Sequence, residues 1–406
     1  MGLNGTPMAD RINIGFFGKR NAGKSSVVSA FTNQNLSIVS EVKGTTTDPV
    51  YKPMDLLPIG PVMIIDTPGI DDVGEMGKLK TKKCMEVMRK VDAALLIVDS
   101  TTGFSKEDSE LYEMLYRRGI PTLVVMNKSD LCTGDTFGGV RDLPSAQIVF
   151  VSALENRGIE KLREMTAVLA GINEAHEIDN CILPSFIKSQ STVLLVVPID
   201  ESTAKGRLIL PHQQVMRACI EKGAVPIVCS DVELEATYKK FEGKIDAVIT
   251  DSQVFDKVSK VVPDSIPMTG FSIVLSAYKG DLDWQIEGAR TISKLEDGDK
   301  VLIAEACTHR TQCNDTGTVK IPKMIREYTG KDVSFDYCSG GEFIADTDIL
   351  KKYKLVIHCG ACTINEREMK YRLNLCRDAG VPMTNYGIAI AEMNNIVKRS
   401  IRIFSM

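Results

Sequence analysis

The chain of 406 residues lacks a basic excess and long apolar runs. Its 49 Lys and Arg residues are outnumbered by 53 Asp and Glu residues, which gives a net charge of −4. Nucleic-acid-binding proteins usually carry a basic excess, so this balance argues against nucleic acid as a partner. Apolar runs such as residues 193–197 are far shorter than the roughly 20 residues that span a bilayer. We therefore expect neither a nucleic-acid partner nor a membrane partner.

The N-terminal residues also lack the charged-then-apolar pattern of a secretory signal, which favours a cytoplasmic location. In that compartment disulfides are the weaker explanation for the 11 cysteines, and metal ligation or buried thiols are stronger. A hydrophobic content of 44% and a charged content of 25% are ordinary for globular protein. The length predicts two to four domains, each able to bury a core.

A phosphate-binding motif lies near the N-terminus. Residues 11–17 have the pattern of a strand and lead into Gly18-Lys19-Arg20-Asn21-Ala22-Gly23-Lys24-Ser25, which is followed by a predicted helix. In this G-x-x-x-x-G-K-S context the glycines let backbone N–H groups surround phosphates at a helix N-terminus. Lys24 reaches the terminal phosphates and the Ser25 hydroxyl binds Mg²⁺. The residues expected to bind the nucleotide here are Asn21, Ala22, Gly23, Lys24, Ser25 and Ser26.

Three further motifs follow predicted strands and identify the base as guanine. Asp66-Thr67-Pro68-Gly69 places Asp66 near Mg²⁺ and the Gly69 N–H near the γ-phosphate. In Asn127-Lys128-Ser129-Asp130, the Asp130 carboxylate accepts two hydrogen bonds from guanine and the Lys128 stem covers the base. The backbone of Ser152 and Ala153 meets the guanine carbonyl. Because these motifs occur in order at strand ends, they predict a GTP-binding parallel sheet.

This first segment resembles the small GTPases of the TrmE–Era group. The resemblance assigns Thr46, within Gly44-Thr45-Thr46-Thr47-Asp48, to Mg²⁺ together with Ser25, and it makes Lys24, Thr46, Gly69 and Asn21 the catalytic residues. Asn21 occupies the position that helps to bind K⁺ in potassium-stimulated members. Ile70 stands where Ras-type enzymes have a water-orienting Gln, and its side chain cannot orient water. We therefore expect slow GTP hydrolysis that K⁺ stimulates.

The rest of the chain continues the alternation of strands and helices. Strands are predicted near residues 193–197, 225–229, 247–250, 300–306, 332–337 and 355–357. The expected fold class is therefore α/β throughout, with three α/β domains, of which the first is a P-loop GTPase with a mainly parallel sheet. The domains are expected at residues 1–175, 176–265 and 266–406. His212, after Pro211, is most simply a residue at the start of a helix.

Three cysteines follow the predicted strands of the last domain. Cys307 comes after one strand, and Cys359 and Cys362 form a C-x-x-C pair after another. If the strands are parallel, these loops converge on one edge of the sheet. The residues alone leave four possibilities open: a zinc site with three Cys and one His, an iron–sulfur cluster, a redox disulfide, or buried thiols. Cys338, also at a strand end, is an outside candidate for a further ligand.

The pattern Cys307-x-His309 followed by His358-Cys359-x-x-Cys362 extends the resemblance to the whole chain, which is similar to the [FeFe]-hydrogenase maturation GTPases. That family combines a GTPase, a dimerisation and a cluster-binding domain. The resemblance implies a homodimer with a [4Fe–4S] cluster on Cys307, Cys359 and Cys362. His309 and His358 match the signature either as a fourth ligand or as residues that orient a thiolate.

The same resemblance implies a scaffold and carrier role. The cargo is a two-iron precursor that two radical-SAM maturases build and that is delivered to the apo-hydrogenase. Two other functions stay open: an RNA-modification or ribosome-assembly GTPase, which the near-neutral last third disfavours, and a regulatory GTPase stabilised by zinc.

Overall fold

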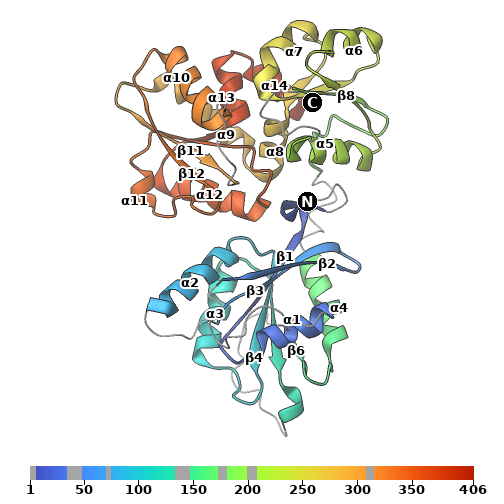
Figure 1. Ribbon diagram of the computed structural model, residues 1–406, viewed down its shortest axis with the longest axis vertical. Helices are drawn as coiled ribbons and strands as arrows, with labels where there is room; N and C mark the ends of the chain where they lie inside the picture. Colours follow the sequence, from blue (N-terminus) through green and yellow to red (C-terminus); the bar gives the residue numbers. More distant parts are fainter. Residues whose placement is uncertain are drawn as a thin grey trace. The chain divides into compact units, whose positions relative to one another are not determined.

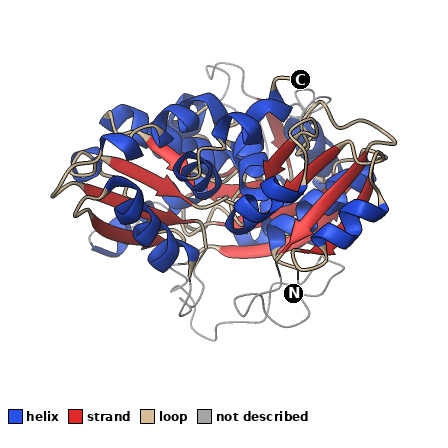
Figure 2. Ribbon diagram, turned by 90° about the horizontal axis from the view of Figure 1, so that it is seen from above, coloured by secondary structure: helices blue, strands red, loops and turns tan. Residues whose placement is uncertain are grey.

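The computed structural model describes residues 6–33, 48–69, 75–132, 147–171, 181–198, 208–307 and 315–406. The chain divides into two compact units, Met1–Asp179 and Asn180–Met406, coloured blue to light green and green to red in Figure 1. Both units contain helices and mainly parallel strands in alternation, and Figure 2 shows the helices in blue and the strands in red. The predicted α/β fold class is confirmed.

The first unit contains one six-stranded sheet. Its strands are β1 (Ile12–Gly18), β2 (Val50–Leu56), β3 (Gly60–Asp66), β4 (Ala93–Asp99), β5 (Thr122–Asn127) and β6 (Gln147–Phe150). They lie in the order β2-β3-β1-β4-β5-β6, and only the β2–β3 pair is antiparallel. The helices are α1 (Lys24–Thr32), α2 (Glu75–Met88), α3 (Lys106–Arg117) and α4 (Ile159–Gly171). The sheet is mainly parallel, as the sequence predicts.

Successive side chains of a strand point to opposite faces of the sheet, so the core of this unit is divided into two parts, one on each face. One face packs against α1 and α4 around Ile14 and Phe16, and the other packs against α2 and α3 around Phe17. Parallel strands buried on both faces read as continuous apolar runs, which is why the sequence located them well. The carboxyl ends of β1, β3 and β5 consequently meet at one edge, where the nucleotide motifs follow them.

The second unit contains two four-stranded parallel sheets. The strands are β7 (Thr192–Val197), β8 (Val225–Ser230), β9 (Ala247–Thr250), β10 (Met268–Gly270), β11 (Lys300–Glu305), β12 (Ser334–Ser339), β13 (Leu355–His358) and β14 (Met383–Asn385). The helices are α5 (Leu210–Glu221), α6 (Leu234–Lys240), α7 (Phe255–Val261), α8 (Phe271–Lys279), α9 (Leu282–Ala289), α10 (Ile321–Thr329), α11 (Thr347–Leu350), α12 (Glu366–Ala379), α13 (Tyr386–Met393) and α14 (Val397–Ile401). The predicted strands of this part are confirmed to within two residues at their ends.

The two sheets of this unit repeat one pattern. Their orders, β10-β9-β7-β8 and β14-β13-β11-β12, are the same when the strands are counted along the chain. Equivalent strands have equal lengths of six, six, four and three residues. The register is also equal, since Val193 pairs with Ala247 as Val301 pairs with Leu355. We refer to residues 192–279 as the first repeat and residues 300–393 as the second repeat.

The sequence carries traces of this repetition. Pro267-Met268-Thr269 and Pro382-Met383-Thr384 occupy the same place at the fourth strand, and Cys229-Ser230 and Cys338-Ser339 the same place at the second. One hydrophobic core includes Leu194 and Val196 of the first repeat with Val301 and Ile303 of the second. The two repeats therefore fold against each other within one compact unit.

The position of β10 bears on the domain boundaries. The predicted boundary between residues 265 and 266 falls just before this three-residue strand, which pairs with β9 in the first repeat. So short a strand gives almost no signal in the sequence, because it is too short to show a period. We propose that the middle segment extends to the end of α8, near residue 280. The division of the chain into three domains stays a prediction.

Within the residues that the structure describes, no helix is long and apolar enough to cross a membrane.

Candidate functional site

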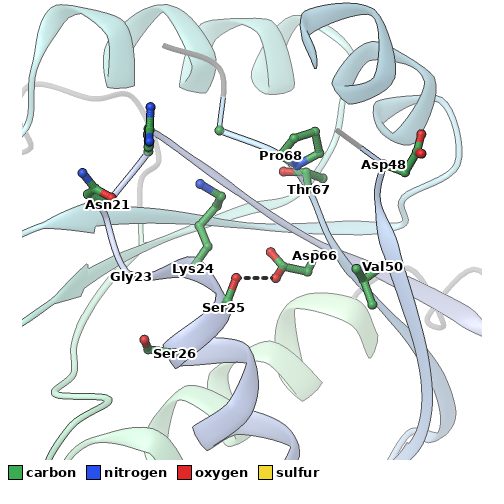
Figure 3. Close-up of a pocket in the computed structure, with 12 residues that line it drawn as sticks. Asn21, Gly23, Lys24, Ser25, Ser26, Asp48, Val50, Asp66, Thr67 and Pro68 are labelled. Atoms are coloured by element: carbon green, nitrogen blue, oxygen red, sulfur yellow. Dashed lines mark hydrogen bonds between the residues drawn. The ribbon is translucent and has the colours of Figure 1, made fainter. Parts of the chain in front are cut away.

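The phosphate-binding loop lines a cavity of about 270 Å³ at the edge of the first sheet (Figure 3). The loop joins β1 to α1, and Gly23 takes the left-handed conformation, with φ of 85°, at the start of the helix. The residues that line the cavity are Arg20, Asn21, Gly23, Lys24, Ser25, Ser26, Asp48, Val50, Asp66, Thr67, Pro68 and Gly69. Seven of the predicted nucleotide-binding residues therefore surround one cavity.

Two of these side chains form a pair that fits Mg²⁺. The Ser25 hydroxyl donates a 2.8 Å hydrogen bond to Asp66 Oδ2, drawn as a dashed line in Figure 3. The other carboxylate oxygen, Oδ1, is buried with no hydrogen-bond partner among the described residues. Burial raises the pKa of Asp66, although Ser25 and Lys24 act in the opposite direction. A hydroxyl oxygen next to a carboxylate with one unbonded oxygen is the kind of ligand set that Mg²⁺ binds.

Lys24 is buried and points into the loop. Its Nζ donates to the carbonyl oxygens of Gly18 (3.0 Å) and Lys19 (2.7 Å). Gly69, on the other side of the cavity, lies so close to the loop that a Cβ there would be 2.8 Å from the Arg20 nitrogen. A glycine at this position therefore lets its backbone approach the place where phosphates would lie.

Asn127 connects the phosphate-binding loop to the predicted base-binding segments. Its side chain is 2% exposed; Nδ2 donates to the Ala22 carbonyl (3.0 Å), and Oδ1 accepts from the Ala153 N–H (3.2 Å). A Cβ at Gly23 would be 2.3 Å from that Nδ2. One buried amide thus holds together three segments, of which the first lies 105 residues before Asn127 and the last 26 residues after it.

The predicted base-binding residues gather around the end of β5. Lys128 adopts φ of 63° and its ammonium pairs with Asp99 at the end of β4. Burial would raise the pKa of Asp99, but the hydrogen bonds from Lys128 and Thr101 outweigh it and the pKa lies below its ordinary value. Asp130 lies in the short η2 helix (Ser129–Leu131), and Ser152 is fully buried. The sequence motifs alone gave no role to Asp99.

Several predicted residues lie outside the described part of the chain. Thr46, Ile70 and His309 are among them. Their predicted roles in Mg²⁺ binding, in slow hydrolysis and in the cluster site stay predictions. Asn21 is described: it has φ of 62° and lines the cavity, while its role toward K⁺ stays a prediction.

In the second unit, the three candidate cysteines follow neighbouring parallel strands. Cys307 lies two residues after β11, and Cys359 and Cys362 follow β13, which pairs with β11. The Cys359 sulfur accepts a hydrogen bond from the Ala306 N–H (3.1 Å), and the Cys359 N–H donates to the Ala304 carbonyl (2.9 Å). The predicted convergence of these loops on one sheet edge agrees with this geometry.

All three thiols have pKa values above the ordinary value of a cysteine. Burial, with contributions from Cys307 and Glu305, raises the pKa of Cys359 to about 11. Burial, with contributions from Cys359 and Cys307, raises the pKa of Cys362 to about 12. Burial and Glu305 raise the pKa of Cys307. Cys338, in contrast, acts on the pKa of Cys376. As they stand, no three His, Cys, Asp or Glu side chains among the described residues are close enough together to hold a metal ion.

The donor chemistry of this cysteine group fits an iron–sulfur cluster better than a hard cation. Thiolates are the usual ligands of such clusters, and a backbone N–H to one sulfur is a typical supporting contact. Metal binding would require the thiols to lose their protons and turn toward one another.

His358 takes part in a buried network rather than pointing at the thiols. Its ring is fully buried; Nε2 lies 3.0 Å from Arg372 and Nδ1 lies 2.8 Å from the Cys359 carbonyl. Because a guanidinium only donates, Nε2 must accept and Nδ1 must carry the proton. Burial and the charge of Arg372 lower the pKa of His358 to about 3. In this arrangement neither ring nitrogen is available to iron, which favours the orienting role.

Arg372 completes this network on α12. Its guanidinium is 1% exposed and contacts Glu368 (3.1 Å) and the Gly340 carbonyl (2.6 Å) besides His358. On the other side of the cysteine loop, the buried Lys279 donates to the carbonyl oxygens of Ala361 (3.1 Å) and Ile364 (2.8 Å). The sequence reasoning missed Arg372, Glu368 and Lys279; the repeated Pro-Met-Thr motif was a signal of the repeat, but the contact of α8 with this loop has no local signal.

Three family models match the chain, and together they cover most of it. The first unit matches the 50S ribosome-binding GTPase model over residues 13–128. The hydrogen maturase F dimerization domain matches residues 182–280, and the hydrogen maturase F tetramerization domain matches residues 283–403. The last two together account for more than half of the 406 residues.

Curated relatives match mainly the GTPase part. The tRNA modification GTPase MnmE of Thermoanaerobacter sp. (strain X514) is 32% identical over 161 residues, which is 39% of this chain and 34% of the relative. GTPase Der of Kosmotoga olearia is 32% identical over 175 residues, which is 40% of this chain and 39% of the relative. The chain thus spans about a third of the length of these relatives.

Among solved structures, Era of Aquifex aeolicus is 17% identical, with a TM-score of 0.34, covering 61% of this chain and 97% of Era. A bacterial selenocysteine-specific elongation factor is 22% identical, with a TM-score of 0.35, covering 44% of this chain and 32% of the factor.

Proposed function

Because the chain belongs to the hydrogen maturase F family of hydrogenase maturation GTPases, we propose that it is a scaffold and carrier that binds a [4Fe–4S] cluster and delivers a two-iron precursor to the apo-[FeFe]-hydrogenase. The observation that carries the proposal is the set of three thiols at the carboxyl ends of β11 and β13, in the same chain as a GTPase cavity. The residues proposed to hold the cluster are Cys307, Cys359 and Cys362.

The GTPase part acts by positioning and electrostatics. The phosphate loop supplies backbone N–H groups, Lys24 exchanges its carbonyl contacts for the terminal phosphates, and Ser25 with Asp66 holds Mg²⁺. Thr46 is proposed to add a ligand to Mg²⁺, and the Gly69 N–H to bind the γ-phosphate. Hydrolysis is proposed to be slow and K⁺-stimulated, because Ile70 cannot orient water and Asn21 can help to bind K⁺.

At the second site, this chain's own residues orient the thiols. His358 fixes the Cys359 carbonyl, Arg372 fixes His358, and the Ala306 N–H fixes one sulfur. When bound, the cluster would supply an iron whose fourth ligand exchanges, at which a two-iron cargo docks. The fourth ligand stays open; of the two candidate histidines, His358 is proposed to orient and not to ligate.

The partners follow from the family. The matched family models are named for dimerization and tetramerization, and they support an oligomer. A homodimer is proposed, with β8 as a suitable edge because Val225 is 48% and Val228 is 43% exposed on this edge strand. The two radical-SAM maturases and the apo-hydrogenase are the proposed protein partners. Loss of the γ-phosphate is proposed to change their affinity.

Anaerobic purification with iron and sulfide analysis tests the cluster. We expect a brown protein with about four irons and four sulfides per chain, and a Cys359→Ser variant that loses most of both. A colourless protein loaded with zinc would refute the cluster and favour a zinc-stabilised regulatory GTPase. Filter binding of RNA across a range of salt concentrations tests the RNA-modification alternative, which the similarity to tRNA modification GTPases raises for the first unit.

A further inference from the structure

The loop that carries Cys359 and Cys362 is held by a helix of the other repeat. Gly360 packs against α8, where a Cβ on that glycine would be 3.3 Å from Ser272 Cβ. At the far end of the same helix, Lys279 Nζ donates to the Ala361 and Ile364 carbonyls. The helix therefore contacts the loop at both helix ends. At the lysine end, the two contacts join residues that are 82 and 85 positions apart in the sequence.

Comparison of the two repeats shows what is special about this contact. The register places Asp251 of the first repeat where the second has Cys359, and Ser252 where it has Gly360. The first repeat therefore has no C-x-x-C pair at its own sheet edge. What it gives to the cysteine group is α8, the helix that follows its fourth strand.

The conformation of the loop needs such support. Ala361, between the two cysteines, has φ of 54° although it is not a glycine, and it is 3% exposed. A non-glycine residue in the left-handed region costs free energy and persists where surrounding contacts hold it. The hydrogen bond from Lys279 to the Ala361 carbonyl is such a contact, because it fixes the peptide group directly before Cys362.

The charge of Lys279 matters as well as its hydrogen bonds. Its side chain is 1% exposed, and an ammonium is costly to bury away from compensating charge. The cysteine group has negative charge beside it from the carboxylates of Glu305 and Asp315, which act on Cys307. A cluster held by three thiolates would add more, and a buried cation beside it would stabilise its reduced form.

We propose that Lys279 is a positioning residue of the cluster site, which fixes the C-x-x-C loop through two carbonyl groups and raises the reduction potential of the [4Fe–4S] cluster. This inference rests on the proposed cluster-binding function. It makes the middle segment of the chain part of the cluster site, beyond any role in assembly.

The test uses the full chain after cluster reconstitution. In Lys279→Met, which keeps the length of the side chain without its charge, we expect the equilibrium between reduced and oxidised cluster to shift about tenfold toward the oxidised form, 59 mV lower for a one-electron couple. The potential is followed by EPR during a dithionite titration. Iron content is measured in parallel, and the unfolding temperature of the apo chain reports on the fold.

Two matched variants separate charge from structure. Lys279→Arg keeps the cation and should retain a potential near that of the wild type. Lys354→Met removes an exposed lysine that directly precedes β13. At about 3.3 Å per strand residue, it lies about 16 Å from Cys359 along the strand, so this variant should leave the potential unchanged. If Lys279→Met takes up no cluster while its apo chain unfolds normally, and Lys279→Arg restores uptake, the positioning role is supported.

Two results would overturn the inference. One is a Lys279→Met protein with wild-type iron content and a wild-type potential. The other is a Lys279→Arg protein that loses potential or uptake as much as Lys279→Met does. A wild-type chain that takes up no iron would instead refute the proposed function, and that result is visible before any variant is compared.

Discussion

The contact between Gly23 and Asn127 makes a quantitative prediction about the nucleotide site. A methyl group at Gly23 meets two obstacles: the backbone has φ of 85°, and Asn127 Nδ2 would be 2.3 Å away. The left-handed conformation costs alanine about 1–2 kcal/mol. Asn127 must also move, although it is buried and makes two hydrogen bonds, each worth about 0.5–1.5 kcal/mol. Gly23→Ala should therefore destabilise the first unit by about 2–5 kcal/mol.

Asn127→Ala should cost about 1–3 kcal/mol, because it removes the same two hydrogen bonds. In the double variant the methyl group has room, and only the conformational cost of Gly23→Ala remains. The double variant should therefore be destabilised by about 2 kcal/mol less than the sum of the two single variants. For a unit of this size that corresponds to about 4–8 °C, so the double variant should melt that much higher than the sum of the single shifts predicts.

Calorimetry on the full chain measures this coupling. The transition of the first unit is the one that GTP shifts to higher temperature, since a ligand stabilises the part that binds it. If the shift in unfolding temperature of the double variant equals the sum of the two single shifts, Asn127 is not displaced by the methyl group and the packing argument is wrong.

Two other predictions address hydrolysis and the cysteine group. Replacing NaCl by KCl at equal ionic strength should raise the GTP hydrolysis rate of the wild type severalfold, whereas Asn21→Ala should hydrolyse GTP equally slowly in both salts; equal wild-type rates would contradict the K⁺ assignment. Arg372→Met should destabilise the second unit by about 3–5 kcal/mol, because it leaves Glu368 buried without its partner, and the added change Glu368→Gln should restore part of the loss in thermal unfolding. A double variant no more stable than Arg372→Met would show that the buried charge is not the cause.

The nucleotide motifs could be read from the sequence because each one is contiguous. A strand, a loop and a helix N-terminus follow one another within a few residues around Lys24, and the parallel order of the strands brings the next motifs to the same edge. The same holds for the cysteines, since Cys307, Cys359 and Cys362 each follow an apolar run that marks a buried strand. Local chemistry combined with parallel topology was therefore sufficient to predict which loops lie at each sheet edge, while the role of the cysteines as cluster ligands stays a prediction.

Tertiary structure decided the contacts between distant segments. Which donor satisfies the Ala361 carbonyl, or which residue fixes the His358 tautomer, depends on packing between elements that no local period encodes. The pairing of the short strand β10 with β9 could not be predicted for the same reason, because three residues show no period. The sequence by itself determined the nucleotide-binding motifs and the positions of the cysteines after strands; the fold decided that a lysine of the first repeat contacts the loop that carries Cys359 and Cys362 in the second.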